Sequence, residues 1–191
     1  MEKCVQEFNQ ELAKEDRMRI YLGCEFHANM QMSRMLDEGR VSTMADSGYV
    51  LVEFSGNAEY SYIEDRLRSL IIVGYRPIIA HAERCDNIWG DLELIRDLAQ
   101  MGAYIQVNAD SILGKSGFYT KRFCRKLMKE DLLHFVGSDC HDSQYRICRT
   151  GEAYRKVASK MGQEYADKIF IENPSAIIKN GENRRKFVKY T

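Results

Sequence analysis

The sequence of 191 residues has no excess of charge of either sign, because 28 lysines and arginines balance 28 aspartates and glutamates. Such a chain has no net electrostatic attraction to nucleic acid or to an anionic membrane, so neither is an expected partner. The only basic cluster in the sequence spans residues 184–189 and is expected to form a solvated tail. No stretch approaches the roughly 18 to 20 apolar residues of a membrane-spanning helix, and the acidic start is unlike a secretory signal. The sequence therefore predicts a soluble, cytoplasmic protein.

Closely paired cysteines and flexible linkers are also missing. The six cysteines include no C-x-x-C pair, and a chain with 45% hydrophobic residues can build a core of this size without disulfides. We therefore expect reduced thiols. No stretch rich in proline, glycine or serine divides the sequence, so a single domain over residues 1–191 is favoured over two small ones.

Short apolar runs alternate with helix-patterned segments along the chain. The expected strands cover residues 19–23, 48–54, 76–81, 103–108 and 132–137. The expected helices cover residues 3–14, 62–75, 91–102, 118–131, 151–162 and 173–180, with only a short helix between residues 30 and 47. Asn173 is expected to cap the last helix, with Pro174 in its first turn. The alternation predicts an α/β fold with about five mostly parallel strands and outer helices, as an open sheet or as part of a barrel.

Polar side chains stand where these strands end, and most of them are of types that bind divalent metals. They are Glu25, Glu53, His81, Asn108, Asp139 and His141. Taken singly, each carboxylate is also typical of a solvated loop, and a lone histidine of a satisfied core position. Because the ends of parallel strands meet at one edge, the set together predicts a metal site. Imidazole and carboxylate without thiolate favour Mn, Fe or Zn, and bridging carboxylates suit a two-metal hydrolase.

Two arginines follow the histidines of this set. Arg84 lies three residues after His81, and Arg146 lies five residues after His141. A planar guanidinium matches two phosphate oxygens, so arginines beside a metal favour a phosphate ester as substrate. Surface salt bridges are the alternative for both.

Cys140 and Arg146 also have the C-x5-R spacing of cysteine-dependent phosphatases. That chemistry needs a loop whose backbone N–H groups surround the phosphate and lower the pKa of the thiol. The intervening HDSQY contains no glycine, and Asp139 places a negative charge next to the thiol. The metal site is therefore the favoured interpretation, with Cys140 as a small packing residue.

With these residues in place, the sequence resembles the PHP (polymerase and histidinol phosphatase) superfamily. Within it, the chain is similar to the manganese-dependent protein-tyrosine phosphatases of capsular and exopolysaccharide operons in Gram-positive bacteria. The resemblance is carried by GCEF, YVLVEF, GYRPIIAHAER, DSILGKSG and HFVGSDCHD, which follow one another in family order.

The resemblance implies a distorted (β/α)7 barrel with a trinuclear metal cluster that hydrolyses phosphotyrosine without a covalent enzyme intermediate. By matching position, the metal ligands would be Glu25, Glu53, His81, Asp139 and His141. Arg84 and Arg146 would hold the substrate phosphate and act as the catalytic arginines. The implied cofactor is a divalent metal, with Mn favoured, and the implied partner is a tyrosine kinase of the polysaccharide operon.

The chain also departs from the pattern of that family. The usual first strand with its H-x-H pair and the next histidine segment are not part of this sequence, which starts after the place of both. The usual H-P-E-R is H-A-E-R here, with His81 and Arg84 kept. His27 cannot replace the H-x-H pair, and His134 lies inside an expected strand. We therefore expect an incomplete barrel with exposed strand edges, a deficient trinuclear set, and self-association. A PHP phosphatase for a small phosphomonoester such as histidinol phosphate, and a catalytically impaired fragment or truncated homologue acting as a scaffold, are the alternatives.

Overall fold

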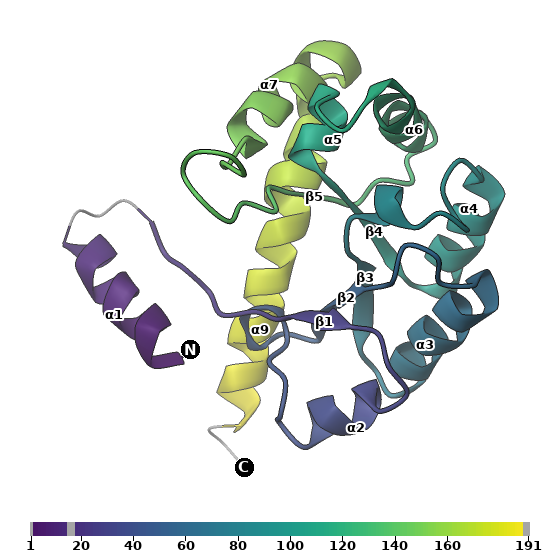
Figure 1. Ribbon diagram of the computed structural model, residues 1–191. Coiled ribbons are helices and arrows are strands. Elements are labelled where there is room, and N and C mark those ends of the chain that lie inside the picture. The colour runs from purple at the N-terminus through teal and green to yellow at the C-terminus, as the bar shows by residue number, and fades with distance from the viewer. Residues whose placement is uncertain (1, 15–17, 189–191) are drawn as a thin grey trace.

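Five strands form one parallel sheet in the computed structural model, which describes residues 2–14 and 18–188 (Figure 1). The strands are β1 (Glu25–His27), β2 (Tyr49–Glu53), β3 (Arg76–Ile79), β4 (Tyr104–Asn108) and β5 (Phe135–Gly137). They pair in chain order, and every pair is parallel. The predicted mostly parallel sheet of about five strands is therefore confirmed, and all the strand ends point to one edge.

The first strand was predicted too early. Residues 19–23 form no strand, and β1 begins at Glu25, where the prediction had the strand end. This strand forms because Glu25 pairs with Leu51 of β2 and His27 pairs with Glu53 of β2. The pairing with β2, and not an apolar run in its own three residues, defines it. The backbone of Ile20 is instead bound by the side chain of Asn9, whose Oδ1 and Nδ2 each lie 2.7 Å from it.

Helices connect the strands and cover the sheet. They are α1 (Glu2–Ala13), α2 (Met32–Asp37), α3 (Tyr60–Ile72), α4 (Leu92–Met101), α5 (Ala109–Leu113), α6 (Phe118–Lys129), α7 (Thr150–Met161), α8 (Gln163–Asp167) and α9 (Asn173–Val188). Three short turns of other helical types are η1 (Met44–Asp46), η2 (Ala82–Arg84) and η3 (Lys168–Glu172). Among the described residues, no helix combines the length and the apolar character needed to cross a bilayer.

Side chains alternate between the two faces of the sheet and build two apolar clusters. Val50 and Val52 of β2 belong to the larger cluster, under α3, α4 and α6. Tyr49 of β2 and Phe135 of β5 belong to the smaller one, which includes Ile177 of α9. Helices α3, α4 and α6 thus lie on one side of the sheet and α9 on the other (Figure 1).

Helix α9 is tied to the segment before β2. Asn180 Oδ1 accepts a hydrogen bond from the backbone N–H of Gly48 at 2.8 Å. Gly181 packs against the backbone of η1 so closely that a Cβ there would collide with the carbonyl oxygen of Ala45. Of the basic cluster at residues 184–189, Arg184 is exposed on α9, and the other side chains lie outside the described part of the chain.

The predicted cap at Asn173 is wrong. Asn173 has helical backbone angles, because α8, η3 and α9 follow one another without a break. Its side-chain Nδ2 donates to the carbonyl oxygen of His134 at 2.8 Å, which fixes the helix to the start of β5. The side chain is thus used for tertiary packing, and it caps nothing.

Candidate metal centre

Three of the predicted ligands come together at the carboxyl edge of the sheet. Nε2 of His81 lies 2.8 Å from Oε1 of Glu25 and 3.3 Å from Oε1 of Glu53. One donor atom from each of these residues lies within 4.8 Å of the others, as donors around a single ion do. Glu25, Glu53 and His81 therefore form a candidate metal group, as the parallel strands predicted.

Separate strands position these side chains. Glu25 opens β1 opposite Leu51 of β2, and Glu53 closes β2 opposite His27 of β1. His81 follows β3 with φ 32°, a left-handed backbone uncommon for residues other than glycine. Gln106 of β4 holds it there, because its Oε1 accepts the His81 N–H at 2.6 Å. The imidazole is thus fixed and buried, while both carboxylates remain partly exposed.

The electrostatics of this group suit a divalent cation. Within the described residues, the ion-pair partners of Glu25 and Glu53 are histidines, with no lysine or arginine among them. Two carboxylates held together repel one another, and a bound cation removes that repulsion. The oxygen and nitrogen donors are those that Mn, Fe and Zn accept. His81 Nδ1 is buried, and among the described residues it has no hydrogen-bond partner, so none of them provides an outer acceptor for this ring.

His27 is a neighbour that the sequence reasoning left unassigned. Its Nδ1 lies 3.4 Å from Glu53 Oε2, and its Nε2 lies 3.5 Å from Ser55 Oγ. The signal was available, because residues two apart in a strand point to the same face and Glu25 is two positions earlier. The ring is largely exposed and extends the group toward solvent.

Asp139 lies among arginines, and the structure does not bring it into the three-residue group. Its Oδ2 accepts from Arg84 Nη2 at 2.9 Å, from Arg146 Nη2 at 2.5 Å and from Asn108 Nδ2 at 2.9 Å. Burial alone would raise the pKa of Asp139, but the two guanidinium charges outweigh it, and the pKa lies below its ordinary value. His141 is exposed, and its Nδ1 lies 3.0 Å from the backbone oxygen of Asp139.

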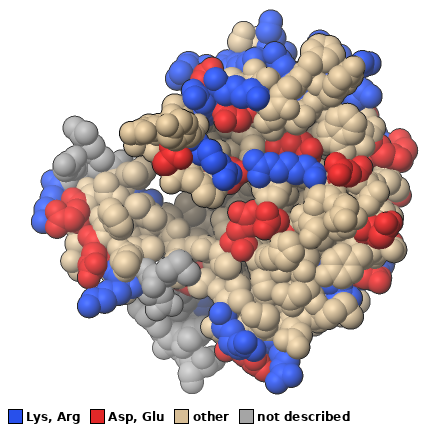
Figure 2. All heavy atoms as spheres, viewed as in Figure 1, with Lys and Arg blue, Asp and Glu red and all other residues tan. Residues whose placement is uncertain are grey.

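A single cavity joins the two parts of the site. It has a volume of about 230 Å³, and its polar wall includes Glu25, His81, Asn108 and Asp139. The opposite wall is apolar and includes Ile177 of α9. Figure 2 shows acidic and basic side chains side by side around a hollow near the middle of this face. The metal group and the arginine-bound Asp139 thus face a common space.

Comparison with known proteins gives this arrangement a family. The model of the family "Capsular polysaccharide synthesis, CpsB/CapC" matches residues 1–179. The chain belongs to this family.

Relatives within the CpsB/CapC family are tyrosine-protein phosphatases by name. The chain is 33% identical to tyrosine-protein phosphatase CpsB of Streptococcus pneumoniae over 186 residues, which cover 93% of this chain and 76% of that protein. It is 30% identical to tyrosine-protein phosphatase YwqE of Bacillus subtilis over 175 residues, which cover 91% of this chain and 68% of that protein.

A solved structure confirms the fold. The crystal structures of YwqE from Bacillus subtilis and CpsB from Streptococcus pneumoniae are described as those of unique metal-dependent tyrosine phosphatases. The match to a chain of that study has a TM-score of 0.85 at 29% sequence identity and covers 93% of this chain and 72% of that one. The predicted resemblance to metal-dependent tyrosine phosphatases of capsule operons is thereby confirmed.

The loop after β5 in this CpsB/CapC chain is not built to cradle a phosphate with its backbone. Oδ1 of Asp142 accepts from the backbone N–H groups of Gln144 and Tyr145, at 2.7 and 2.5 Å, and lies 3.2 Å from that of Arg146. These hydrogen bonds hold the pKa of Asp142 below its ordinary value. Because the N–H groups are already used inside the loop, the structure favours the metal site over a cysteine mechanism at Cys140.

Glu83 is a buried residue that the sequence reasoning passed over. Its Oε1 accepts from the backbone N–H of Asn108 at 2.9 Å and from the hydroxyl of Ser111 at 2.7 Å, and its Oε2 is buried without a partner. Burial raises the pKa of this carboxyl, although both hydrogen bonds act in the opposite direction. Glu83 thus links η2, which carries Arg84, to the end of β4. No periodicity in H-A-E-R distinguishes it from an exposed glutamate.

Proposed function

We propose that this protein is a metal-dependent phosphatase that hydrolyses phosphotyrosine in proteins. The observation that carries the proposal is the cavity lined by Glu25 and His81 of the metal group and by Asp139, whose carboxylate pairs with two arginines. The names of the relatives, tyrosine-protein phosphatase CpsB and YwqE, support the same chemistry.

In this proposal, one set of residues binds the cation and a second set orients the phosphate. Glu25, Glu53 and His81 would hold the cation, which when bound supplies an activated water and neutralises charge on the phosphoryl group. Arg84 and Arg146 would orient the phosphate from two different loops. Each uses Nη2 on Asp139, which leaves its other N–H groups to donate to phosphate oxygens.

Several finer assignments are part of the proposal. Mn is the proposed ion because of the resemblance to manganese-dependent phosphatases, and the nitrogen and oxygen donors would also accept Fe or Zn. Asp139 and His141 are proposed as further ligands, and Arg84 and Arg146 as the catalytic arginines. A tyrosine kinase of the polysaccharide operon is the proposed partner, inside the cell. The sheet edges at β1 and β5 support self-association, which light scattering at several protein concentrations would test.

The deciding experiment is phosphate release from a phosphotyrosine peptide with added Mn²⁺, then with a chelator, then with Mn²⁺ restored. We expect activity that disappears and returns. His81→Asn is the matched variant, because asparagine tolerates the left-handed backbone but removes the imidazole. It should lower metal affinity by about 100-fold or more and abolish turnover at limiting metal.

The same assay separates the alternatives. Faster hydrolysis of histidinol phosphate than of the phosphopeptide would favour a phosphatase of small phosphomonoesters. A folded protein with no hydrolysis of either substrate at saturating Mn²⁺ would contradict the enzymatic proposal and favour a scaffold.

A further inference from the structure

Helices α6 and α7 carry a local excess of positive charge in a chain that is neutral overall. Together they contain eight lysines and arginines and one acidic residue, Glu152. Figure 2 shows blue spheres gathered over the upper part of the molecule, where Figure 1 places these helices. The sequence suggested no such cluster, because residues 130–149 separate the two helices and only the fold brings their charges together.

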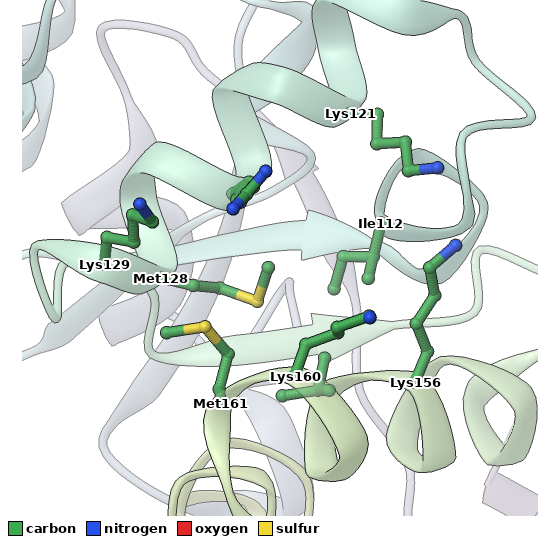
Figure 3. Close-up of a pocket in the computed structure, with 9 residues that line it drawn as sticks. Ile112, Lys121, Met128, Lys129, Lys156, Lys160 and Met161 are labelled. Carbon is green, nitrogen blue, oxygen red and sulfur yellow. The ribbon is translucent and has the colours of Figure 1, made fainter.

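A pocket of about 300 Å³ lies between the two helices, outside the candidate metal centre. Its charged wall consists of Lys121, Arg125, Lys129, Lys156 and Lys160, and no carboxylate lines it. Its apolar wall consists of Ile112, Met128, Val157 and Met161. In Figure 3, Met128 and Met161 extend toward one another, and Lys121 and Lys156 stand together at the other end.

The cations of this pocket have no acidic partners. Within the described residues, none of the five forms an ion pair with a carboxylate. The nearby acids are used elsewhere: Glu130 pairs with Arg96, Asp131 with Lys168, and Glu152 with Arg149. Burial and then the charge of Lys121 lower the pKa of Lys156, whose Nζ donates to the carbonyl oxygen of Leu113 at 3.3 Å. An anion in the pocket would relieve this repulsion.

The shape of the pocket restricts what kind of anion fits. Its apolar residues are recessed, with Met128 8% and Val157 1% exposed, so they cannot project into a lipid layer. No aromatic side chain lines it, so it offers no platform for stacking bases. The volume accommodates a large apolar side chain, with carboxylates on either side reaching the lysines.

We propose that the pocket between α6 and α7 is a docking site for an acidic peptide segment of a partner protein that carries a large apolar side chain. The apolar side chain would occupy the space between Met128 and Met161. The flanking carboxylates would pair with the exposed cations, such as Arg125 and Lys160. The site goes beyond the proposed phosphatase activity and needs neither metal nor hydrolysis.

The test is fluorescence anisotropy with a labelled, unphosphorylated peptide in which one phenylalanine is flanked by glutamates on both sides, in the presence of a chelator. We expect saturable binding that weakens by about tenfold in the double variant Arg125→Glu, Lys160→Glu. The matched control is Lys126→Glu, Arg155→Glu, which makes the same charge change on exposed positions of the same helices outside the pocket. A peptide with alanine in place of phenylalanine should also bind more weakly.

Several outcomes would overturn the proposal. They are no binding to the unaltered protein, equal weakening in the control variant, and full competition by inorganic phosphate at equimolar concentration with the peptide. Stronger pocket-dependent binding to phosphatidylserine vesicles than to the peptide would overturn it in favour of a membrane surface. Both double variants should hydrolyse p-nitrophenyl phosphate like the unaltered protein. Failure of the phosphatase proposal would appear there, independently of the binding result.

Discussion

Nη2 of Arg146 lies 2.5 Å from Oδ2 of Asp139, the same oxygen that accepts from Arg84 and Asn108. One carboxylate oxygen therefore accepts hydrogen bonds from three segments of the chain, which are η2, the end of β4 and the loop after β5. Without this shared carboxylate, the two guanidinium groups would repel one another. Asp139 thus sets the spacing of both arginines, and under the proposed function that spacing would suit a doubly charged group such as phosphate.

Replacing Arg146 separates phosphate binding from metal binding. Arg146→Ala should lower kcat/KM on a phosphotyrosine peptide by about 10- to 100-fold, because it removes a charge-assisted hydrogen bond to phosphate. Metal content by mass spectrometry should stay unchanged. Arg34→Ala is the control, since that exposed arginine pairs with Glu38 on α2. Loss of metal in Arg146→Ala would contradict this assignment.

The stability contributed by Asp139 should depend on pH. Its pKa lies below the ordinary value, so its stabilisation is present above the unfolded-state value of about 4 and is lost as pH falls through the lower folded value. Asp139→Asn, which tolerates the left-handed backbone at this position, should lower the free energy of unfolding by about 1 kcal/mol. The loss is small because both arginines are half exposed, so solvent screens their attraction to the carboxylate.

Urea unfolding of both proteins in a chelator measures this effect. The difference between them should be constant at neutral pH and disappear in strong acid. A difference that grows toward low pH would show that the arginines do not stabilise the carboxylate.

Replacing the loop cysteine tests the metal mechanism against the cysteine mechanism. Cys140→Ser should keep kcat within about twofold, because the thiol is exposed and the backbone donors of its loop are occupied by Asp142. Cys4→Ser, at another exposed cysteine, is the control. Inactivation by Cys140→Ser alone, with metal content intact, would reject the metal mechanism.

Glu83 should matter for stability through its hydrogen bonds. Glu83→Ala leaves the buried N–H of Asn108 without its acceptor and should cost about 1–3 kcal/mol, while the hydroxyl of Ser111 keeps Ser116 Oγ as an acceptor at 3.1 Å. Glu83→Gln keeps an acceptor and should cost less. Denaturant unfolding of both variants checks the order, and equal losses would contradict it.

The pH dependence at Glu83 has the opposite sign to that at Asp139. Because burial raises its folded pKa, the wild-type protein should lose stability as pH rises from the unfolded-state value of about 4 through the folded value. Glu83→Gln has no titrating carboxyl at this position. The free energy of unfolding of the wild-type protein should therefore rise relative to that of Glu83→Gln as pH falls.

Much of the fold was predictable because local pattern and tertiary structure agree. Helix α4 begins where Asp91 accepts from the N–H groups of Glu93 and Leu94 and ends at Gly102 with φ 113°, as the sequence indicates. The first strand was not predictable, since three residues become a strand only by pairing with β2. Asn173 misled for a similar reason, because its side chain bonds to the distant His134.

The candidate site was predictable as far as strand direction determines it. Parallel strands bring Glu25, Glu53 and His81 to one edge, and the structure confirms this convergence. Loop geometry decides the rest. Asp139 has a left-handed backbone, and its side chain is directed to the arginines by contacts across 55 and 7 residues of sequence. No spacing rule encodes such contacts.

The attachment of α9 to Gly48 has a consequence for the order in which the protein is completed during synthesis. The residues of the metal group have all been synthesised once His81 is added, and Asp139 is added later. The face of the sheet that carries Tyr49 and Phe135 is covered only after Ile177 and Gly181 have been made. Until then Tyr49 and Phe135 lack their cover. The nascent chain therefore contains the metal-group residues before helix α9 can cover the apolar face of the sheet. During that interval the exposed apolar face makes the chain most prone to aggregation.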